Sequence, residues 1–453
     1  MKILIAGCGR VGQTLARELS AEGHDLTLMD SDPRVLESGM ERYDVMAVQG
    51  NCASMQTLRE AGVEKADLLI ACTGSDELNL LCCMTAHVVN SRLHTIARIR
   101  NPEYTEQAYH MRDAFALSMT FNPELQAAVE IDRLLKFPGF LQRDSFAKGR
   151  VEIVEIRIDG DSKLRDVPLS ILYSIVKCRV LVCTVLRDGV AFTPDGQFTL
   201  REGDRIFVTA SSDNLALLLK NLGIVTRKVR RVMIAGGGTV TYYLTELLRE
   251  SRMEVTIIES DEERCVELAS EFPYANVIHG DASEQSLLES EDVGSVDALI
   301  ALTSKDELNM VISLYGHSRE ISQTIAKLEY LDDSGMTGEL PLGSVISPRR
   351  LCCNNIVRYV RAMQNQSGAA ITIHSIADGQ AEAMEFRVDR DTLHCGVPLK
   401  KLKLKSNVLL VGISNGSNTQ IPNGDSTYHP GDTVVVVAGG DTVVRQLNDI
   451  FAS

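Results

Sequence analysis

A glycine-rich turn near the N-terminus has the residue types and spacing that hold a nucleotide diphosphate. Gly7, Gly9 and Gly12 form a Gly-x-Gly-x-x-Gly motif after a short apolar run at residues 3–5, and a helical pattern and a second apolar run then lead to Asp30. Such glycines allow a tight turn and a close approach of pyrophosphate, while N–H groups at the helix start bind phosphate. Asp30 stands where a ribose hydroxyl would be bound. We favour nucleotide binding over a purely structural glycine turn, because the whole strand–turn–helix–strand context is present.

Composition and charge exclude other function classes. The chain has 453 residues, enough for about three or four domains, of which 44% are hydrophobic and 24% charged. Its formal charge of −15 opposes general nucleic-acid binding, which depends on cations that neutralise phosphates. It has no Trp and only 5% aromatic residues, which disfavours a base-stacking platform. We therefore expect no nucleic-acid partner.

Apolar runs and cysteines give two further expectations. No apolar run approaches the ~18 residues that span a bilayer, and the first expected strand begins at Lys2, which leaves no room for a signal peptide. We therefore expect a cytoplasmic protein. Eleven cysteines, several within apolar segments, indicate buried reduced thiols. The adjacent pairs at 82–83 and 352–353 lack zinc-ligand spacing, so we expect no metal site.

An internal repeat organises the chain. The segment RVMIAGGGTV at 231–240 restates KILIAGCGRV with an offset of 229, so that Gly236 matches Gly7 and Glu259 matches Asp30. Further along, DLLIACTGSDELN at 67–79 matches DALIALTSKDELN at 297–309.

Each copy predicts the same two-part architecture. In the first copy, buried apolar strands are expected near 2–6, 25–30, 45–48, 67–72 and 95–100. Strands of this kind alternating with helices predict an α/β fold with a doubly wound, Rossmann-like parallel sheet that binds ligands at its carboxyl ends. We term this sheet with its helices the N-lobe.

A helix and a small α+β module, the C-lobe, follow each N-lobe. Asn122-Pro123 and Ser347-Pro348 are helix-start signals for exit helices over about 123–136 and 348–361. In C-lobe 1, apolar Ile156 and Ile158 alternate with charged Glu155 and Arg157, a pattern typical of a strand. A terminal helix is expected in each C-lobe, at 213–221 and 441–450. The expected domains are N-lobe 1 (1–122), exit helix and C-lobe 1 (123–228), N-lobe 2 (229–347), and exit helix and C-lobe 2 (348–453).

The acidic and amide residues after the fourth strand have two interpretations. Asp76, Glu77 and Asn79 would cap a helix N-terminus, since carboxylates and amides are favoured there. A ligand role is equally compatible with the pattern.

Together these motifs resemble the regulator-of-conductance-of-potassium (RCK, or KTN) family. The shared features are the glycine motif, an acid after strand two, Gly-[Asn/Asp] after strand three, Thr-x-x-Asp-Glu-x-Asn after strand four, and Arg or Lys in strand five. The resemblance implies a cytosolic gating ring that binds NAD(H), or adenine nucleotides such as ATP or ADP. It also implies a homo-oligomer, expected to be a tetramer, docked on an integral membrane potassium-translocating subunit.

The resemblance also implies a set of binding residues. In N-lobe 1 these are a phosphate loop, a ribose acid, two adenine-side residues, two residues at the strand-four edge and a phosphate-facing cation: Gly7, Cys8, Gly9, Arg10, Val11 and Gly12; Asp30; Asn51 and Cys52; Thr73 and Gly74; and Arg98. The matching residues of N-lobe 2 are Gly236, Gly237, Gly238, Thr239 and Val240; Glu259; Asp281 and Ala282; Thr303 and Ser304; and Lys327.

The second copy departs from the first at two of these places. Thr241 replaces Gly12, which we expect to push helix and strand apart, and Glu329 replaces Arg100, which reverses a charge. The second pocket could therefore take a different nucleotide, bind weakly or be structural. In the first, Asp30 disfavours NADP because its carboxylate would repel a 2′-phosphate.

An NAD-dependent oxidoreductase is the alternative function. It would need a proton-transfer residue beside the nicotinamide and a substrate pocket. The nine histidines are scattered, and no P-loop, HExxH or GxSxG motif is present. We favour a non-enzymatic regulator because the architecture is duplicated, with a soluble subunit of a cation antiporter as a smaller alternative within that class.

Overall fold

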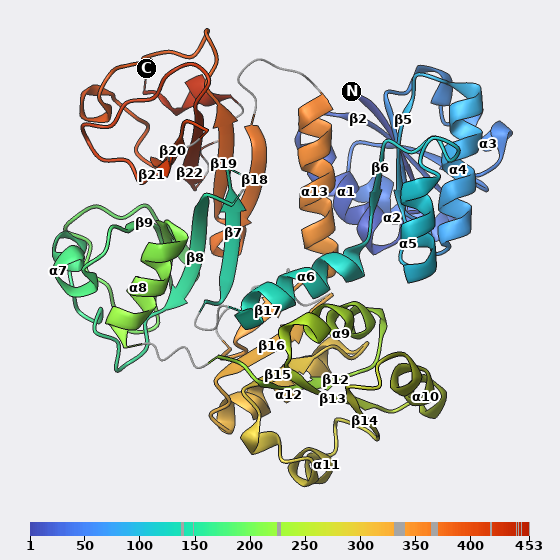
Figure 1. Cartoon of the computed structure of the whole chain (residues 1–453). Helices are drawn as coiled ribbons and strands as arrows, with labels where there is room; N and C mark the ends of the chain where they lie inside the picture. The colour runs from blue at the N-terminus through green and yellow to red at the C-terminus, as the bar shows by residue number, and fades with distance from the viewer. Residues whose placement is uncertain are drawn as a thin grey trace. The chain divides into compact units, whose positions relative to one another are not determined.

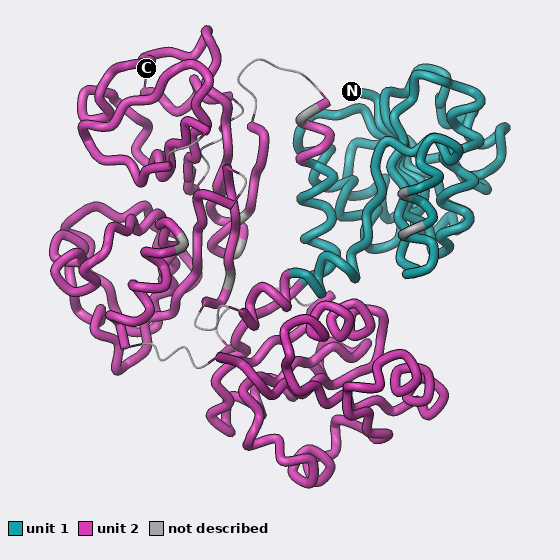
Figure 2. The backbone as a smooth tube through the Cα atoms, viewed as in Figure 1, with its two compact units in different colours: residues 1–129, 347–357 teal, residues 130–346, 358–453 magenta. Residues whose placement is uncertain are grey.

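The computed structural model divides the chain into two compact units (Figure 2). Unit 1 comprises residues 1–129 and 347–357, and unit 2 comprises residues 130–346 and 358–453. The residues described are 1–136, 140–147, 149–223, 228–329, 340–363, 370–416, 419–440, 442, 444 and 446–452. Within them, no helix is both long enough and apolar enough to cross a membrane.

N-lobe 1 is a six-stranded parallel sheet with strand order β3-β2-β1-β4-β5-β6 (Figure 1). This order is that of a doubly wound dinucleotide-binding sheet and confirms the predicted fold class. The sixth strand was not predicted, because it has only three residues. The elements are β1 (Lys2–Ala6), α1 (Arg10–Ala21), β2 (Asp25–Asp30), α2 (Pro33–Arg42), β3 (Met46–Gln49), α3 (Met55–Glu60), η1 (Val63–Lys65), β4 (Leu68–Ala71), α4 (Asp76–Val89), β5 (His94–Arg98), α5 (Pro102–His110) and β6 (Met119–Phe121).

N-lobe 2 repeats this topology, with strand order β14-β13-β12-β15-β16-β17 and all pairs parallel. Its elements are β12 (Arg231–Ala235), α9 (Thr239–Ser251), β13 (Glu254–Glu259), α10 (Glu262–Glu271), β14 (Asn276–His279), α11 (Gln285–Ser290), η3 (Val293–Ser295), β15 (Ala298–Ala301), α12 (Asp306–Ser318), β16 (Gln323–Lys327) and β17 (Ser344–Ile346).

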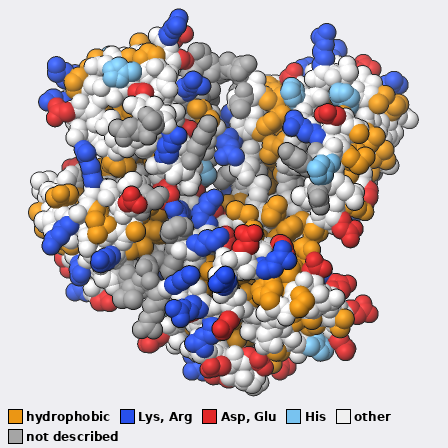
Figure 3. Space-filling view, viewed as in Figure 1, with side chains coloured by type: hydrophobic (Ala, Val, Ile, Leu, Met, Phe, Trp, Pro, Cys, Tyr) orange, Lys and Arg blue, Asp and Glu red, His pale blue; other side chains and the backbone are white. Residues whose placement is uncertain are grey.

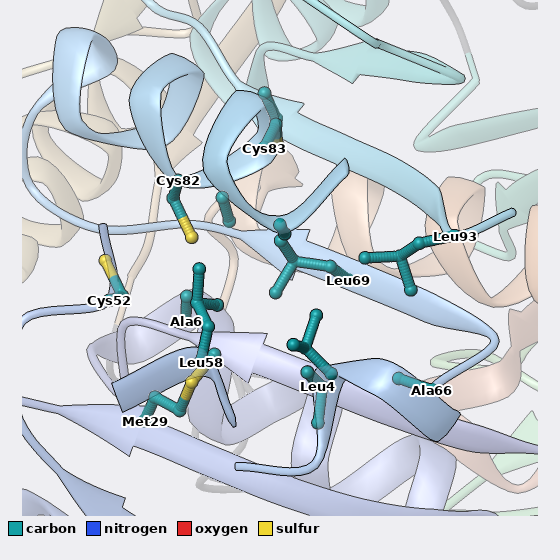
Figure 4. Packing of buried hydrophobic residues seen from close by; sticks show 14 of the residues in the cluster. Leu4, Ala6, Met29, Cys52, Leu58, Ala66, Leu69, Cys82, Cys83 and Leu93 are labelled. Carbon is teal, nitrogen blue, oxygen red and sulfur yellow. The ribbon is translucent and has the colours of Figure 1, made fainter. Parts of the chain in front are cut away.

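Cysteines contribute to the core of N-lobe 1. Figure 4 shows Cys52, Cys82 and Cys83 among Leu4 and Leu69, and each of these side chains is at most 4% exposed. Burial of such side chains is the main stabilising contribution, typically about 1.5–3 kcal/mol for a large apolar group. All eleven cysteines are free thiols and ten are buried. Burial raises the pKa of the Cys83 thiol to about 12, so this thiol stays protonated at neutral pH.

The exit helices contact N-lobes of the opposite repeat. They are α6 (Pro123–Lys136) and α13 (Pro348–Met363). Residues 348–357 of α13 belong to unit 1, where the Cys353 thiol lies 3.9 Å from the carbonyl O of Val11. In unit 2, Gln323 of β16 donates through Nε2 to the carbonyl O of Leu134 on α6, at 3.1 Å. Each repeat is thus built partly from the helix of the other.

The two C-lobes are antiparallel five-stranded sheets with orders β10-β9-β11-β8-β7 and β18-β19-β22-β20-β21. The elements of C-lobe 1 are β7 (Gln142–Phe146), β8 (Val151–Arg157), η2 (Leu169–Ile171), α7 (Leu172–Val176), β9 (Leu181–Arg187), β10 (Val190–Phe192), β11 (Arg205–Ala210) and α8 (Ser212–Leu222). Those of C-lobe 2 are β18 (Ala370–Ile376), η6 (Ala377–Gly379), β19 (Ala381–Arg387), η7 (Leu399–Lys401), β20 (Val408–Ser414), β21 (Thr419–Gln420), β22 (Thr433–Gly439) and η8 (Leu447–Ile450).

The C-lobe sheets pack on each other through a shared apolar core. Val151 and Phe207 of C-lobe 1 lie in one buried cluster with Val411 and Val435 of C-lobe 2. The predicted alternation places Glu155 on the face opposite Ile156, and the structure shows that this face is buried as well. This side chain is 2% exposed and pairs with Arg205, because the second C-lobe covers that face.

The predicted helix at 441–450 is also wrong in its extent. The structure places only the 3₁₀ turn Leu447–Ile450 there, while residues 441, 443 and 445 lie outside the described part of the chain. Charge of both signs covers the face shown in Figure 3, so the net negative charge does not produce a uniformly acidic surface there.

Candidate nucleotide-binding sites

The glycine loop of N-lobe 1 lies at the carboxyl end of β1, beside β4, where the strand order reverses. Gly7 has a φ of +97°, and a Cβ there would lie 2.7 Å from the backbone N of Thr73. A Cβ at Gly12 would lie 2.0 Å from the carbonyl O of Gly7. Only glycine fits at these two positions, because a side chain would collide with backbone.

Gly9 differs from these two glycines because it borders open space. A Cβ at Gly9 would meet no atom within 4 Å, and its φ of −65° is open to any residue. Gly9 is the N-cap of α1, and among the described residues no side chain caps that helix. The N–H groups of a first helical turn lack intrahelical partners and favour an anion. The loop therefore fits the diphosphate of a nucleotide.

Asp30 lies directly against this loop. One carboxylate oxygen accepts the backbone N–H of Cys8 at 2.7 Å, and the other accepts that of Asp32 at 3.0 Å. The Cys8 side chain is fully buried, with its pKa raised by burial, so it presents backbone rather than thiol to the loop surface. Asp30 thus ends β2 beside the loop and holds the loop in shape, while its role as the ribose acid stays a prediction.

The strand-four and strand-five residues are joined by a buried amide. Asn79 accepts from the backbone N and the hydroxyl of Thr73 at 2.8 and 2.7 Å, and donates to the carbonyl O of Arg98 at 3.0 Å. The Arg98 guanidinium donates to the carbonyl O of Thr73 at 2.7 Å. The structure therefore brings Thr73 and Arg98 together, with exposed Gly74 next to them.

Ser75, not its acidic neighbours, caps α4. The Ser75 hydroxyl accepts the backbone N–H of Leu78, whereas buried Asp76 accepts the backbone N–H groups of Arg100 and Asn101 at 2.7 and 2.8 Å. The capping interpretation of Asp76 and Asn79 is therefore wrong. Asp76 ties the start of α4 to the segment after β5, and Asn79 ties it to Arg98 at the end of β5.

The two adenine-side candidates differ in accessibility. Asn51 is exposed and accepts the backbone N–H of Ala53 at 3.0 Å. The Cys52 side chain is 4% exposed and packs in the core, where a hydrogen bond with Cys82 lowers the pKa of its thiol (Figure 4). Only Asn51 offers a side chain to a ligand.

N-lobe 2 has the same glycine loop, but different side chains hydrogen-bond to its backbone. Gly236 has a φ of +103°, and Glu259 accepts the backbone N–H of Gly237 at 2.5 Å. Thr241 is buried, and its hydroxyl donates to the carbonyl O of Gly236 at 2.5 Å. The turn thus keeps its left-handed glycine although the third glycine is lost, and Gly238 again borders open space.

Two substitutions in this loop compensate each other. A Cβ at Gly237 would lie 2.7 Å from Leu268 Cδ1 and 3.0 Å from Glu259 Cγ. The second repeat has the longer Glu259 where the first has Asp30. It therefore has Gly237 where the first has Cys8, because a side chain at 237 would collide with Glu259. Sequence reasoning missed Arg264, which donates through Nε to the carbonyl O of Gly237 at 2.8 Å. No motif signals it, because its counterpart in the first repeat is apolar Val35.

The remaining second-lobe candidates reproduce the first lobe. Asn309 accepts from Thr303 at 2.9 and 2.7 Å and donates to the carbonyl O of Lys327 at 2.8 Å. Thr239, Ser304 and Asp281 are exposed, and a hydrogen bond from the Ser283 backbone lowers the pKa of Asp281; Val240 and Ala282 are buried. Over the described ranges, no group of three or more His, Cys, Asp or Glu side chains could hold a metal ion.

Comparisons with known proteins agree with this architecture. The family profile of the TrkA-N domain matches residues 3–116 and 232–348, and that of the TrkA-C domain matches residues 153–223. The chain is 32% identical over 451 residues, covering 100% of both chains, to a "Trk system potassium uptake protein TrkA homolog" of Archaeoglobus fulgidus. It is 29% identical over 460 residues to the "Trk system potassium uptake protein TrkA" of Haemophilus influenzae, covering 100% of this chain and 98% of that one.

Solved structures share the fold at low identity. The GsuK RCK domain has a TM-score of 0.60 at 17% identity and covers 97% of this chain and 92% of its own. A GsuK channel described as bound to NAD has a TM-score of 0.59 at 16% identity, with coverages of 97% and 77%.

Proposed function

This chain belongs to the TrkA family, and on that basis we propose that it is the peripheral, nucleotide-binding regulatory subunit of a potassium uptake system. It binds NAD(H) in N-lobe 1 and gates an integral membrane subunit that translocates potassium. The two curated relatives described above are named as potassium uptake proteins rather than oxidoreductases, so hydride transfer forms no part of the proposal.

The observation that carries the proposal is the first glycine loop. Gly7 and Gly12 can only be glycine, Gly9 borders open space, and Asp30 stands against the loop within hydrogen-bonding distance of Cys8 N–H. A diphosphate at the start of α1 and a ribose at Asp30 suit these groups, because one needs N–H donors and the other a carboxylate acceptor. NAD would supply both parts, and the NAD named for the GsuK channel supports this choice.

The second pocket is proposed to bind an adenine nucleotide, such as ATP or ADP, or to serve assembly. Its strand-five cation is Lys327 in place of Arg98, and Arg264 and Thr241 support its loop differently. Lysine offers phosphate a point charge rather than the two-pronged contact of arginine. We expect the two pockets to divide the work, with the first sensing the nicotinamide or adenylate pool.

We further propose a homotetramer that acts at the cytoplasmic face of the membrane. A regulator must bind its ligand with different affinity in two conformations, or binding cannot shift a pore. Coupling of about 1–3 kcal/mol, roughly 5- to 150-fold in affinity, is typical of such systems.

Two experiments test the proposal. Mass spectrometry of the denatured, purified chain should identify copurified nucleotide. Potassium flux in vesicles that contain the membrane subunit should respond to NADH with the intact chain and lose that response with Gly9→Val. Flux that responds equally well with Gly9→Val would reject the first pocket as the sensor.

A further inference from the structure

Strands β7 and β18 occupy equivalent places in the two C-lobes. Asp144 pairs in register with Ile153 in the first sheet, and His374 pairs with Ala383 in the second. The same offset of 230 relates both members of these pairs, so Asp144 and His374 stand at the same position of the repeat. They contact each other, with His374 Nδ1 2.9 Å from Asp144 Oδ1. Equivalent positions of the two C-lobes therefore carry different ionisable groups.

A second difference in charge lies in the segment that begins with the leucine of each Val-Pro-Leu turn. In C-lobe 2, residues 399–405 read Leu-Lys-Lys-Leu-Lys-Leu-Lys and hold four of the chain's fourteen lysines, here named the lysine row: Lys400, Lys401, Lys403 and Lys405. In C-lobe 1, residues 169–175 read Leu-Ser-Ile-Leu-Tyr-Ser-Ile and include no charged side chain. No Asp or Glu occurs from residue 392 to residue 424, although the chain has 61 such acids. The lysine row is therefore not balanced by acids along the chain.

Residues 450–452 hold the backbone of the lysine row in place. The Ala452 N–H donates to the carbonyl O of Lys403 at 2.8 Å, and the Lys405 N–H donates to the carbonyl O of Ile450 at 2.9 Å. An antiparallel bridge lies between these two hydrogen bonds. The lysines thus stand on a segment whose backbone is hydrogen-bonded to the rest of C-lobe 2.

Leucines alternate with the lysines and turn the lysine row outward. Leu402 and Leu404 pack against the buried core of C-lobe 2. Because neighbouring side chains of an extended segment point in opposite directions, Lys403 and Lys405 point away from that core. Lys400, Lys401 and Lys403 are exposed, and Lys405 is half-buried.

Three of the four lysines have no counter-charge. Lys400 Nζ lies 2.5 Å from Asp425 Oδ1. Over the described ranges of the chain, the ammonium groups of Lys401, Lys403 and Lys405 have no hydrogen-bond or ion-pair partner. The lysine row therefore offers three unpaired positive charges to a partner outside the chain.

We propose that the lysine row is a docking surface for a bilayer that contains anionic lipid. This contact goes beyond the proposed regulation by nucleotide, and it can hold or fail independently of that function. It would add a direct lipid contact to the peripheral location proposed above.

The chemistry of lysine favours lipid headgroups as the partner. Its ammonium group is a compact charge on a flexible four-carbon stem, so it can follow mobile headgroup phosphates without the fixed two-pronged geometry of arginine. A lysine near an anionic bilayer contributes about fivefold to binding. Three unpaired lysines therefore contribute up to roughly 100-fold.

The formal charge of −15 does not prevent this contact. At an ionic strength of ~0.15 M the Debye length is about 8 Å, so charges farther than this from the bilayer are largely screened. The lysine row then acts through its local charge rather than through the net charge of the chain. Binding of this kind must weaken as salt is added.

Co-sedimentation of the full chain with lipid vesicles tests the proposal. The wild type should sediment with vesicles of phosphatidylglycerol and phosphatidylcholine in equal parts, and stay in solution with vesicles of phosphatidylcholine alone. Binding should fall at least about tenfold between ~0.1 M and ~1 M salt, because the Debye length shortens from about 10 Å to about 3 Å.

A triple variant of the lysine row shows whether these lysines carry the binding. Lys401→Gln, Lys403→Gln and Lys405→Gln, combined in one chain, should lower the vesicle partition coefficient at least about tenfold. Arginine at the same three positions keeps the charge and should bind within about threefold of the wild type. Far-UV circular dichroism checks that both variants are folded.

The matched control changes the net charge equally but elsewhere. It combines substitutions of three exposed lysines outside the row, Lys65→Gln, Lys220→Gln and Lys228→Gln. Because both glutamine variants lose three positive charges, only the place of the change differs. The control should bind anionic vesicles as the wild type does.

Three outcomes overturn the proposal. The first is a wild type that does not bind anionic vesicles, and the second is an equal loss of binding in the row variant and its control. The third is row-dependent binding to polyglutamate without binding to vesicles, which would assign the row to an acidic protein partner. NADH calorimetry on the same samples keeps the two proposals apart, since the row variant should keep the NADH affinity of the wild type.

Discussion

The carboxylate of Asp30 holds the backbone N–H of Cys8 at 2.7 Å, and Glu259 holds that of Gly237 in the same way. In each repeat, the acid at the end of the second strand is therefore already hydrogen-bonded to the backbone of the glycine loop. A ribose must share this carboxylate with the loop or displace part of the contact. Changes at Asp30 therefore affect loop shape as well as ligand affinity, and Gly9 is the cleaner probe of binding.

Gly9→Val should abolish or strongly weaken NADH binding while the lobe stays folded. A side chain there meets only open space in the protein, so any clash is with the diphosphate. The loss of affinity should be tenfold or more, which corresponds to about 1.4 kcal/mol. Calorimetry with the full chain measures it, and far-UV circular dichroism checks folding.

The second repeat provides the control for this substitution. Gly238→Val fills equally open space in N-lobe 2 and should leave the tighter NADH site unchanged. Asp30→Ala should cost about 1.5–3 kcal/mol of NADH binding, as for hydrogen bonds to a charged group. Unchanged affinity in both Gly9→Val and Asp30→Ala would remove the assignment of the first pocket.

Asn79→Ala should destabilise N-lobe 1 and weaken its ligand site together. The substitution leaves the Thr73 N–H and the Arg98 carbonyl without this partner, and the site is fully buried. Unpaired buried polar groups cost about 1–3 kcal/mol each, so we expect a loss of about 2–4 kcal/mol on urea unfolding. Asn309→Ala should cause a similar loss of stability in N-lobe 2 but leave NADH affinity unchanged. Equal effects of both variants on NADH binding would argue against a local role.

Thr241→Gly should destabilise N-lobe 2 by about 1–2 kcal/mol, because it removes a buried hydroxyl bond to Gly236 and places glycine in a helix. It should also change second-site binding while leaving oligomer assembly intact, as judged by calorimetry and light scattering. The reverse change, Gly12→Thr, should cost about 1–3 kcal/mol or more, since its Cβ collides with the Gly7 carbonyl. A Gly12→Thr variant of wild-type stability would show that the first loop adapts as the second does.

The stability of unit 2 should fall as pH rises through the range in which Glu130 ionises. The pKa of Glu130 is about 7 in the folded chain against an ordinary value of 4.5, so the folded chain binds the proton more tightly than the unfolded chain. Stability therefore declines from about pH 4.5 to pH 7, by at most about 3 kcal/mol, and this contribution is constant above that range. Urea unfolding of wild type and Glu130→Gln at pH 5 and pH 8 measures it. An identical pH dependence in both proteins would show that another group dominates.

The repeat and its strands were predictable because each depends on local patterns. The glycine spacing, the apolar strands and the acids at 30 and 259 carry enough information to place the N-lobe sheets and their loops. The three-residue strands β6 and β17 gave no such signal, since their pairing depends on the neighbouring strand.

Features that depend on contacts between distant segments could not be predicted. The burial of Glu155 follows from the second C-lobe, which lies more than 200 residues away in the sequence. Arg264 reaches the second glycine loop only because α10 places it there, and Asp76 bonds backbone after β5 rather than capping its own helix. In each case tertiary contacts override the local pattern.

The pairing of Asp144 with His374 has a consequence for how the two halves recognise each other. In a symmetric assembly of identical chains, the same surface patch meets itself, so an acid at this position would face another acid. The two halves of this chain are not identical, and they carry an aspartate and a histidine at this position, which contact each other. Separately produced halves should therefore prefer each other over their own kind, since self-association of the first half would bring two Asp144 carboxylates together and cost binding energy through like-charge repulsion. Each half of the chain thus carries, at this position, a preference for the other half over a second copy of itself.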